Sequence, residues 1–61
     1  MNTYWFEVTD EESELCGEEF FVESDCLEMA WDIAVENFDV KLKCHGVVSN
    51  YFAEMMGYDT Y

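Results

Sequence analysis

Four side chains in this 61-residue chain could bind a soft metal ion or act as a nucleophile: Cys16, Cys26, Cys44 and His45. Their spacing, C-x9-C-x17-C-H, contains none of the closely spaced pairs from which zinc sites are usually built. Cys44 and His45 are neighbours in a segment that reads as a strand, so their side chains should point to opposite faces and cannot form a Cys–His nucleophile pair. We therefore expect no metal site and no catalytic site.

Carboxylates are by far the most abundant reactive groups, since 15 Asp and Glu residues face only two Lys or Arg residues and the formal net charge is -13. A carboxylate pair that acts as general acid and base needs one member in an apolar pocket, and no segment indicates such a pocket. The acidic segment 10–17 (DEESELCG) lacks the alternating Asp residues and the central Gly of a calcium loop. We expect a protein that is not an enzyme and needs no cofactor.

The most regular acidic pattern lies in residues 25–39, DCLEMAWDIAVENFD, which read as an amphipathic helix. Glu28, Asp32 and Glu36 recur every four residues, which sets them in a line roughly 6 Å apart at a rise of about 1.5 Å per residue. Like charges four apart destabilise a helix by a few tenths of a kcal/mol per pair. A plain solvated face is the simplest explanation, but such faces normally mix both signs of charge.

The sign of the charge restricts the partners. The first 39 residues hold 13 acids and no Lys or Arg, whereas direct contacts to phosphate need these bases. Binding to nucleic acid or to an anionic membrane is therefore not expected. A row of negative charges is complementary to a Lys- and Arg-lined nucleic-acid groove, so the expected partner is a basic nucleic-acid-binding protein. Further acids that could join the row precede the second strand: Asp10, Glu11, Glu12 and Glu14.

Strands must hold these acids in place. The β-branched and aromatic run TYWFEV predicts a strand over residues 3–8, and EEFFVE predicts a second over 18–23, with 10–17 as the hairpin loop. The alternating segment VKLKCH predicts a third strand over 40–45. Gly46 then marks either its end or a bulge.

The acidic helix is expected to start at a cap formed by Ser24 or Asp25 and to end at Asn37 or Asp39. Its spacing predicts a buried stripe that packs on the sheet. The stripe and the residues expected to widen it are Leu27, Ala30, Trp31, Ala34 and Phe38, with Met29, Ile33 and Val35.

A short second helix over residues 50–56 is predicted from Ser49, which can cap it, and from Gly57, which can end it. The tail 58–61 is expected to be extended or irregular and could fold back through its tyrosines. Together these elements predict an α+β fold in ββαβα order. It is a small two-layer sandwich in which a three-stranded antiparallel sheet carries the main helix on one face, with a short C-terminal helix.

The other sheet face should display Trp5 and Phe21 among polar side chains. Exposed aromatics in such surroundings are typical interface anchors, although the second helix or the tail could equally cover them. Lys41 and Lys43 are expected to pair with glutamates across the strands.

The length predicts one domain, residues 1–61, that is a monomer or a weak dimer. The N-terminal residues MNTYWFEVTDEE lack the basic and apolar regions of a signal peptide, and no apolar run is long enough to span a bilayer. Three cysteines, an odd number, fit a reducing cytoplasm better than a disulfide framework.

In size, acidity, ββαβα layout and lack of catalytic residues, the chain resembles the small inhibitors carried by phages and mobile elements, such as anti-CRISPR proteins and antirestriction DNA mimics. The resemblance implies a cytoplasmic protein of a bacterial host cell that binds a CRISPR effector or another defence nuclease and blocks access to DNA. Such effectors read DNA with arginines in a basic channel. The acids of the helix and the loop would then stand in for phosphates, and Trp5 or Phe21 would add an apolar anchor.

Two alternatives remain open at this point. The chain could be a small adaptor or regulatory domain that binds a protein through its open sheet face, with its acidity serving solubility. It could also be an antitoxin-like module that neutralises a basic partner.

Overall fold

A computed structural model describes all 61 residues and shows five elements in ββαβα order. This confirms the predicted α+β class, the element order and the three-stranded antiparallel sheet. The elements are β1 (Asn2–Val8), β2 (Glu19–Ser24), α1 (Leu27–Asn37), β3 (Leu42–Val48) and α2 (Asn50–Met56).

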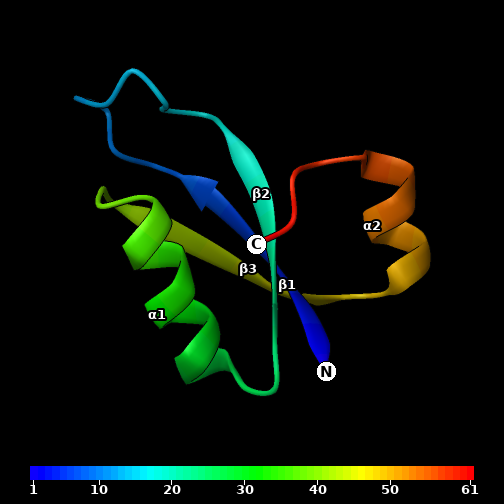
Figure 1. Ribbon diagram of the computed structural model, residues 1–61. Coiled ribbons are helices and arrows are strands. Elements are labelled where there is room, and N and C mark those ends of the chain that lie inside the picture. The colour runs from blue at the N-terminus through cyan, green and yellow to red at the C-terminus, as the bar shows by residue number, and fades with distance from the viewer.

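The sheet has the strand order β2-β1-β3, so the first strand lies in the centre and pairs with both others (Figure 1). Phe6, in the middle of β1, lies opposite Phe20 on one side and Cys44 on the other. The register along β3 then shifts between Trp5 and Phe6, because Gly46 adopts a φ of 113°. The bulge expected as one alternative at Gly46 is thus present.

The third strand begins and ends later than predicted, at Leu42–Val48 in place of residues 40–45. The chain is still turning before it, since the N–H of Val40 donates to the carbonyl of Phe38. At the other end, the bulge absorbs Gly46 without ending the strand, so that Val47 and Val48 continue to pair with β1.

The inner face of the sheet packs against α1 and forms the core. Phe6 and Phe20 are buried there, and Phe6 meets the edge of Trp31 at 4.9 Å between ring centroids. Phe20 stacks on Phe38 at 4.3 Å. The other buried core residues are Tyr4, Val8, Val22, Ala30 and Ala34. Burial of these rings and of the small helix residues is the main favourable term in a domain of this size.

The buried stripe of α1 is narrower than predicted. Leu27, Met29 and Val35 are 47%, 51% and 46% exposed, so these three residues were wrongly expected to be buried. Only Ala30 and Ala34 are fully buried on the helix, because their small side chains let the helix axis approach the sheet. Neither helix is long and apolar enough to cross a lipid bilayer.

The cap of α1 also differs from the prediction. Cys26 occupies the N-cap position and makes no side-chain cap hydrogen bond. Ser24 cannot serve, because it is the last residue of β2, is buried opposite Asn2, and donates its hydroxyl to the carbonyl of Cys26. By contrast, the Ser49 hydroxyl caps α2 as predicted, and Gly57 ends it in the left-handed region at φ 67°.

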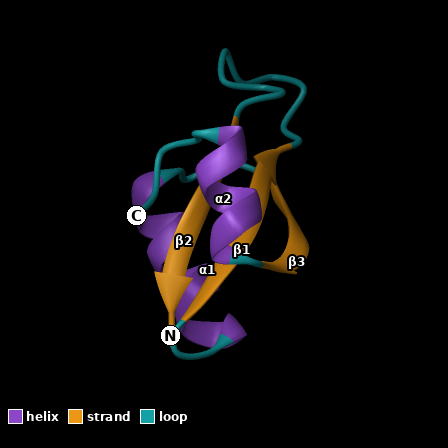
Figure 2. Ribbon diagram, turned by 90° about the vertical axis from the view of Figure 1, so that its right-hand side faces the viewer, coloured by secondary structure: helices purple, strands orange, loops and turns teal.

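The outer face of the sheet is covered by α2, which lies across the sheet from α1, and by Tyr58 at the start of the tail (Figures 1 and 2). The ring of Phe52 lies 5.3 Å from Trp5 and 6.4 Å from Phe21, and Tyr58 lies 5.3 Å from Phe21. A third, partial layer is therefore added to the predicted two.

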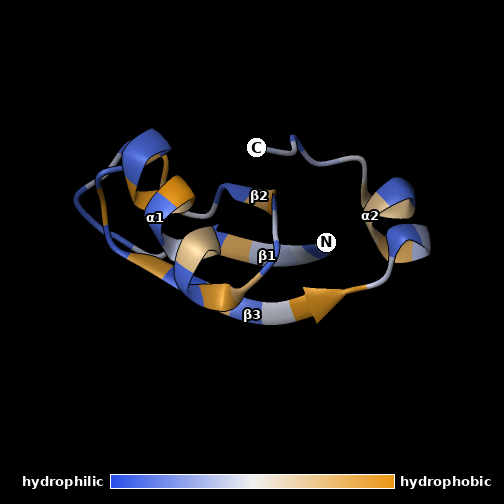
Figure 3. Cartoon of the chain, turned by 60° about the horizontal axis from the view of Figure 1, so that its bottom comes forward, coloured by the Kyte–Doolittle hydropathy of each residue, from blue (hydrophilic) through white to orange (hydrophobic).

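The tail folds back onto the free edge of β2. Phe21 exchanges backbone hydrogen bonds with Asp59 and Tyr61, and Thr60 forms a parallel bridge to it. The Tyr61 ring reaches the α1 side and meets Phe20 and Phe38 edge-on. The edge of β3 remains open, and its last residues form the hydrophobic arrowhead in Figure 3, where Val47 is 59% exposed.

Candidate functional site

The acidic row of α1, defined as Glu28, Asp32 and Glu36, is fully displayed on the helix surface. All three residues are exposed, and none takes part in a salt bridge, because the only salt bridge in the structure joins Glu7 and His45. The row therefore presents three uncompensated carboxylates over roughly 12 Å of helix.

Two exposed apolar side chains flank the acidic row. At about 100° per residue, Met29 lies to one side of the row and Val35 to the other. Their exposed fractions, 51% and 46%, are high for such side chains. The outer surface of α1 thus combines a line of negative charge with apolar contacts on both sides.

The acids of the hairpin loop lie at the end of the sheet where α1 finishes. The N–H of Thr9 donates to the carbonyl of Lys41, just beyond the helix. Asp10 is half-buried and accepts the N–H of Glu12 in a turn, so it shapes the loop. Glu11, Glu12 and Glu14 are exposed.

A shallow hollow of about 460 Å³ is lined by Thr9, Asp10, Glu11, Glu12 and Lys41. Lys41 forms no salt bridge there. It is nevertheless a base beside the loop acids, so the loop carries less uncompensated charge than the acidic row.

The aromatic residues expected on an open face are not free to contact a partner. Phe21 is completely buried beneath Phe52 and Tyr58, so of the two alternatives left open by the sequence, coverage by the second helix and the tail is the one that holds for it. Trp5 is half-buried between His45, at 4.3 Å, and Phe52. The open sheet face on which the adaptor hypothesis depended is therefore covered.

A polar cluster that the sequence did not reveal lies on the outer face of the sheet beside Trp5 and Tyr58, and we call it the Glu–Glu–His cluster: Glu7, Glu19 and His45. Glu7 and Glu19 face each other across β1 and β2, and the Nε2 atom of His45 lies 2.7 Å from Oε1 of Glu7. The expected pairing of lysines with glutamates does not occur; Lys43 lies opposite Glu7 in the register without forming a salt bridge. The register of the three strands brings these residues together.

The carboxylate of Glu19 is held by two donors. The Trp5 indole N–H donates to Oε1 and the Tyr58 hydroxyl donates to Oε2, each at 3.0 Å. The hydrogen bond to Glu19 raises the pKa of the Tyr58 phenol, because only the neutral phenol can donate; desolvation and the negative charge of Glu19 act in the same direction.

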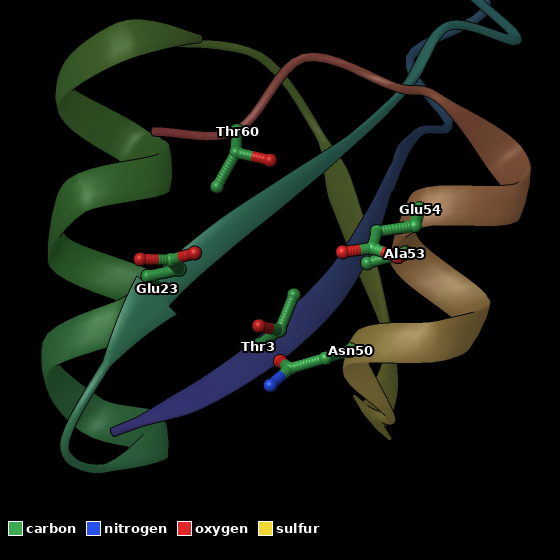
Figure 4. A pocket seen from close by; sticks show the side chains of 6 residues that line it. All are labelled: Thr3, Glu23, Asn50, Ala53, Glu54 and Thr60. Atoms are coloured by element: carbon green, nitrogen blue, oxygen red, sulfur yellow. The ribbon is translucent and has the colours of Figure 1, made fainter.

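The three cysteines and the second hollow of the structure do not form a recognisable catalytic or metal site. Cys16 and Cys26 are exposed, Cys44 is half-buried, and all three are free thiols. A second open hollow of about 420 Å³ lies between the sheet and α2 and is lined by Thr3, Glu23, Asn50, Ala53, Glu54 and Thr60 (Figure 4). This lining offers amide, hydroxyl and carboxylate groups, but it contains no histidine, lysine or cysteine.

No protein-family model, curated protein or solved structure matches this chain in sequence or fold.

Proposed function

We propose that this protein is a non-enzymatic inhibitor that binds a basic nucleic-acid-binding protein and occupies its DNA site by acidic mimicry. The target class is a defence nuclease, with a CRISPR effector as the leading candidate, in the cytoplasm of a bacterial host cell. The acidic row of α1 is the observation that carries the proposal.

The free-energy cost of the acidic row to the isolated protein supports this proposal. Two pairs of like charges four residues apart cost the helix about 0.4–1 kcal/mol in total, in a small domain whose whole stability is on the order of 3–9 kcal/mol. No lysine or histidine offsets this cost. A basic groove would do so on binding, and the same charges would accelerate the encounter.

Charge alone gives little specificity, because any basic groove attracts it. The apolar neighbours Met29 and Val35 supply contacts that a partner can select, and they take the role first expected of Trp5 and Phe21. The acids of the hairpin loop extend the negative surface beyond the end of α1.

The test begins with capture of guide-loaded CRISPR effectors and other defence nucleases by the tagged protein, at about 0.15 M and 0.5 M salt. Mimicry predicts that capture weakens at the higher salt, where the Debye length falls below about 8 Å. It also predicts that duplex DNA displaces the captured nuclease. Fluorescence anisotropy of a labelled target duplex then measures how well the protein blocks DNA binding by the captured nuclease.

Two triple variants separate the row from the bulk charge. Glu28→Lys/Asp32→Lys/Glu36→Lys reverses the row, and Glu23→Lys/Glu54→Lys/Asp59→Lys reverses three exposed acids elsewhere, so both shift the net charge equally. We expect the row variant to lose at least tenfold in inhibition and the control to stay within about threefold. Equal losses of inhibition in the two variants would show that only the net charge matters. Unchanged inhibition by the row variant would refute the proposal.

A further inference from the structure

We propose that the Glu–Glu–His cluster binds one divalent transition-metal ion of the Zn²⁺ type as a structural site. This proposal is independent of the inhibitor function, since the cluster lies on the outer face of the sheet and the acidic row lies on α1. It concerns residues that sequence spacing alone did not mark as ligands.

The three ligand atoms converge from three strands. One carboxylate oxygen each from Glu7 and Glu19 and one ring nitrogen of His45 all lie within 4.8 Å of one another. Antiparallel pairing sets the two glutamates opposite each other, and the bulge at Gly46 adds His45 as the extra residue of β3. Glu7 and Glu19 are half-buried and His45 is exposed, so an ion from solution can reach the cluster.

The donor set selects the kind of ion. One imidazole nitrogen with two carboxylate oxygens suits Zn²⁺ and its first-row neighbours, whereas Mg²⁺ and Ca²⁺ prefer oxygen ligands alone. Zinc bonds of about 2.0–2.2 Å place tetrahedral ligand atoms roughly 3.3 Å apart. The 2.7 Å contact between His45 and Glu7 must open by about 0.6 Å, and the widest separation must close, which rotation about side-chain bonds permits. Water would complete the coordination.

The surroundings already orient the ligands as outer-shell partners do in metal sites. Each oxygen of Glu19 accepts one hydrogen bond, from Trp5 or from Tyr58, and each keeps a second lone pair for an ion. The Trp5 ring lies against the His45 ring at 4.3 Å and limits its rotation.

The electrostatics of the cluster favour a cation. Two carboxylates directly opposite on neighbouring strands destabilise a sheet, and neither is paired with a lysine. The charged and titratable groups that face the cluster are Lys43 on β3 and Tyr58 on the tail. A divalent ion would neutralise both glutamates and leave His45 neutral as a ligand. The acids of α1 and of the loop lack any nitrogen donor and do not converge across strands.

The experiment uses the untagged full chain with Cys16→Ser and Cys26→Ser, so that exposed thiols do not compete for the metal. Calorimetry measures Zn²⁺ binding in a large excess of Mg²⁺, which saturates the scattered carboxylates. We expect one site per chain, a rise in melting temperature of at least about 5 °C at saturation, and a shift of the Trp5 indole N–H signal in NMR spectra. Absence of saturable one-to-one binding overturns the proposal.

Variants in the same background identify the ligands. His45→Gln keeps a hydrogen-bond donor near Glu7 but removes the imidazole, and we expect at least a tenfold loss of Zn²⁺ affinity. If His45→Gln does not fold, Glu19→Gln, which keeps one acceptor oxygen for its neighbours, decides the question with the same expectation. The matched control Glu28→Gln/Glu36→Gln should bind within about twofold of the parent. Binding by the ligand variants equal to that of the parent would place the ion elsewhere and refute the site.

Discussion

The packing of α2 and the tail over the sheet makes a sharp prediction for Phe21. Its ring is completely buried and lies between Phe52 and Tyr58. Truncation of such a ring to alanine costs about 3–5 kcal/mol, against a total stability on the order of 3–9 kcal/mol for a domain of this length. Phe21→Ala should therefore leave the protein largely unfolded or unfolding well below the parent temperature.

A milder change gives a measurable transition. Phe21→Leu keeps an apolar side chain of smaller volume and should cost roughly 1–1.5 kcal/mol, which corresponds to a fall in melting temperature of about 4–12 °C. The matched control is Tyr51→Leu, since Tyr51 is 74% exposed on α2 and should change stability by less than about 0.5 kcal/mol.

Thermal and urea unfolding followed by circular dichroism measure both substitutions. A melting temperature of Phe21→Ala within about 5 °C of the parent, which corresponds to roughly 1 kcal/mol, would contradict the packed outer layer. The outer sheet face would then be open, as the adaptor hypothesis requires.

Two further predictions concern charge. Asp32→Asn removes the central charge of the acidic row and with it both like-charge pairs. The free energy of unfolding should therefore rise by about 0.4–1 kcal/mol, and the melting temperature in low salt by roughly 2–8 °C. An unchanged or lower melting temperature would show that the row carries no repulsion. Because the pKa of Tyr58 is raised in the folded state, its hydrogen bond to Glu19 adds stability that is fully present below pH about 10 and is lost as the pH rises through the folded-state value. Urea unfolding at a series of pH values should therefore show Tyr58→Phe less stable than the parent at pH 8 and the difference shrinking as the pH rises above about 10, whereas a constant difference would refute the coupling.

Local sequence signals were sufficient for much of the fold. The Ser49 cap and the Gly57 stop lie within one short segment, and α2 has the predicted bounds. The alternation around Phe6 and Phe20 likewise placed the inner face correctly. These features depend on residues that are close together in the sequence, so a local sequence pattern is enough to predict them.

The wrong predictions concern residues whose environment is set by a segment far away in the sequence. Ser24 has the right chemistry for a cap, but pairing with Asn2 draws it into the sheet. Phe21 is buried by Phe52 and Tyr58, which lie more than thirty residues away. Alternation assigned Phe21 to the correct face and left open whether α2 and the tail cover that face; only the tertiary structure decides that they do.

The candidate site divides in the same way. The acidic row follows from helical spacing, and its exposure agrees with the prediction. The Glu–Glu–His cluster needs the register of three strands and one bulge, none of which the spacing of these residues indicates.

The pairing of β2 with residues 59–61 has a consequence for the newly made chain. During synthesis, β2 can pair with β1 as soon as both have been made, but its other edge stays unpaired until residue 61 has been added. The exposed edge contains Phe20, Phe21 and Val22, a run that would promote aggregation between nascent chains. Glu19 and Glu23 flank this run and repel a second copy of it. Part of the acidity of this chain therefore lies where it opposes association of unfolded chains through this run.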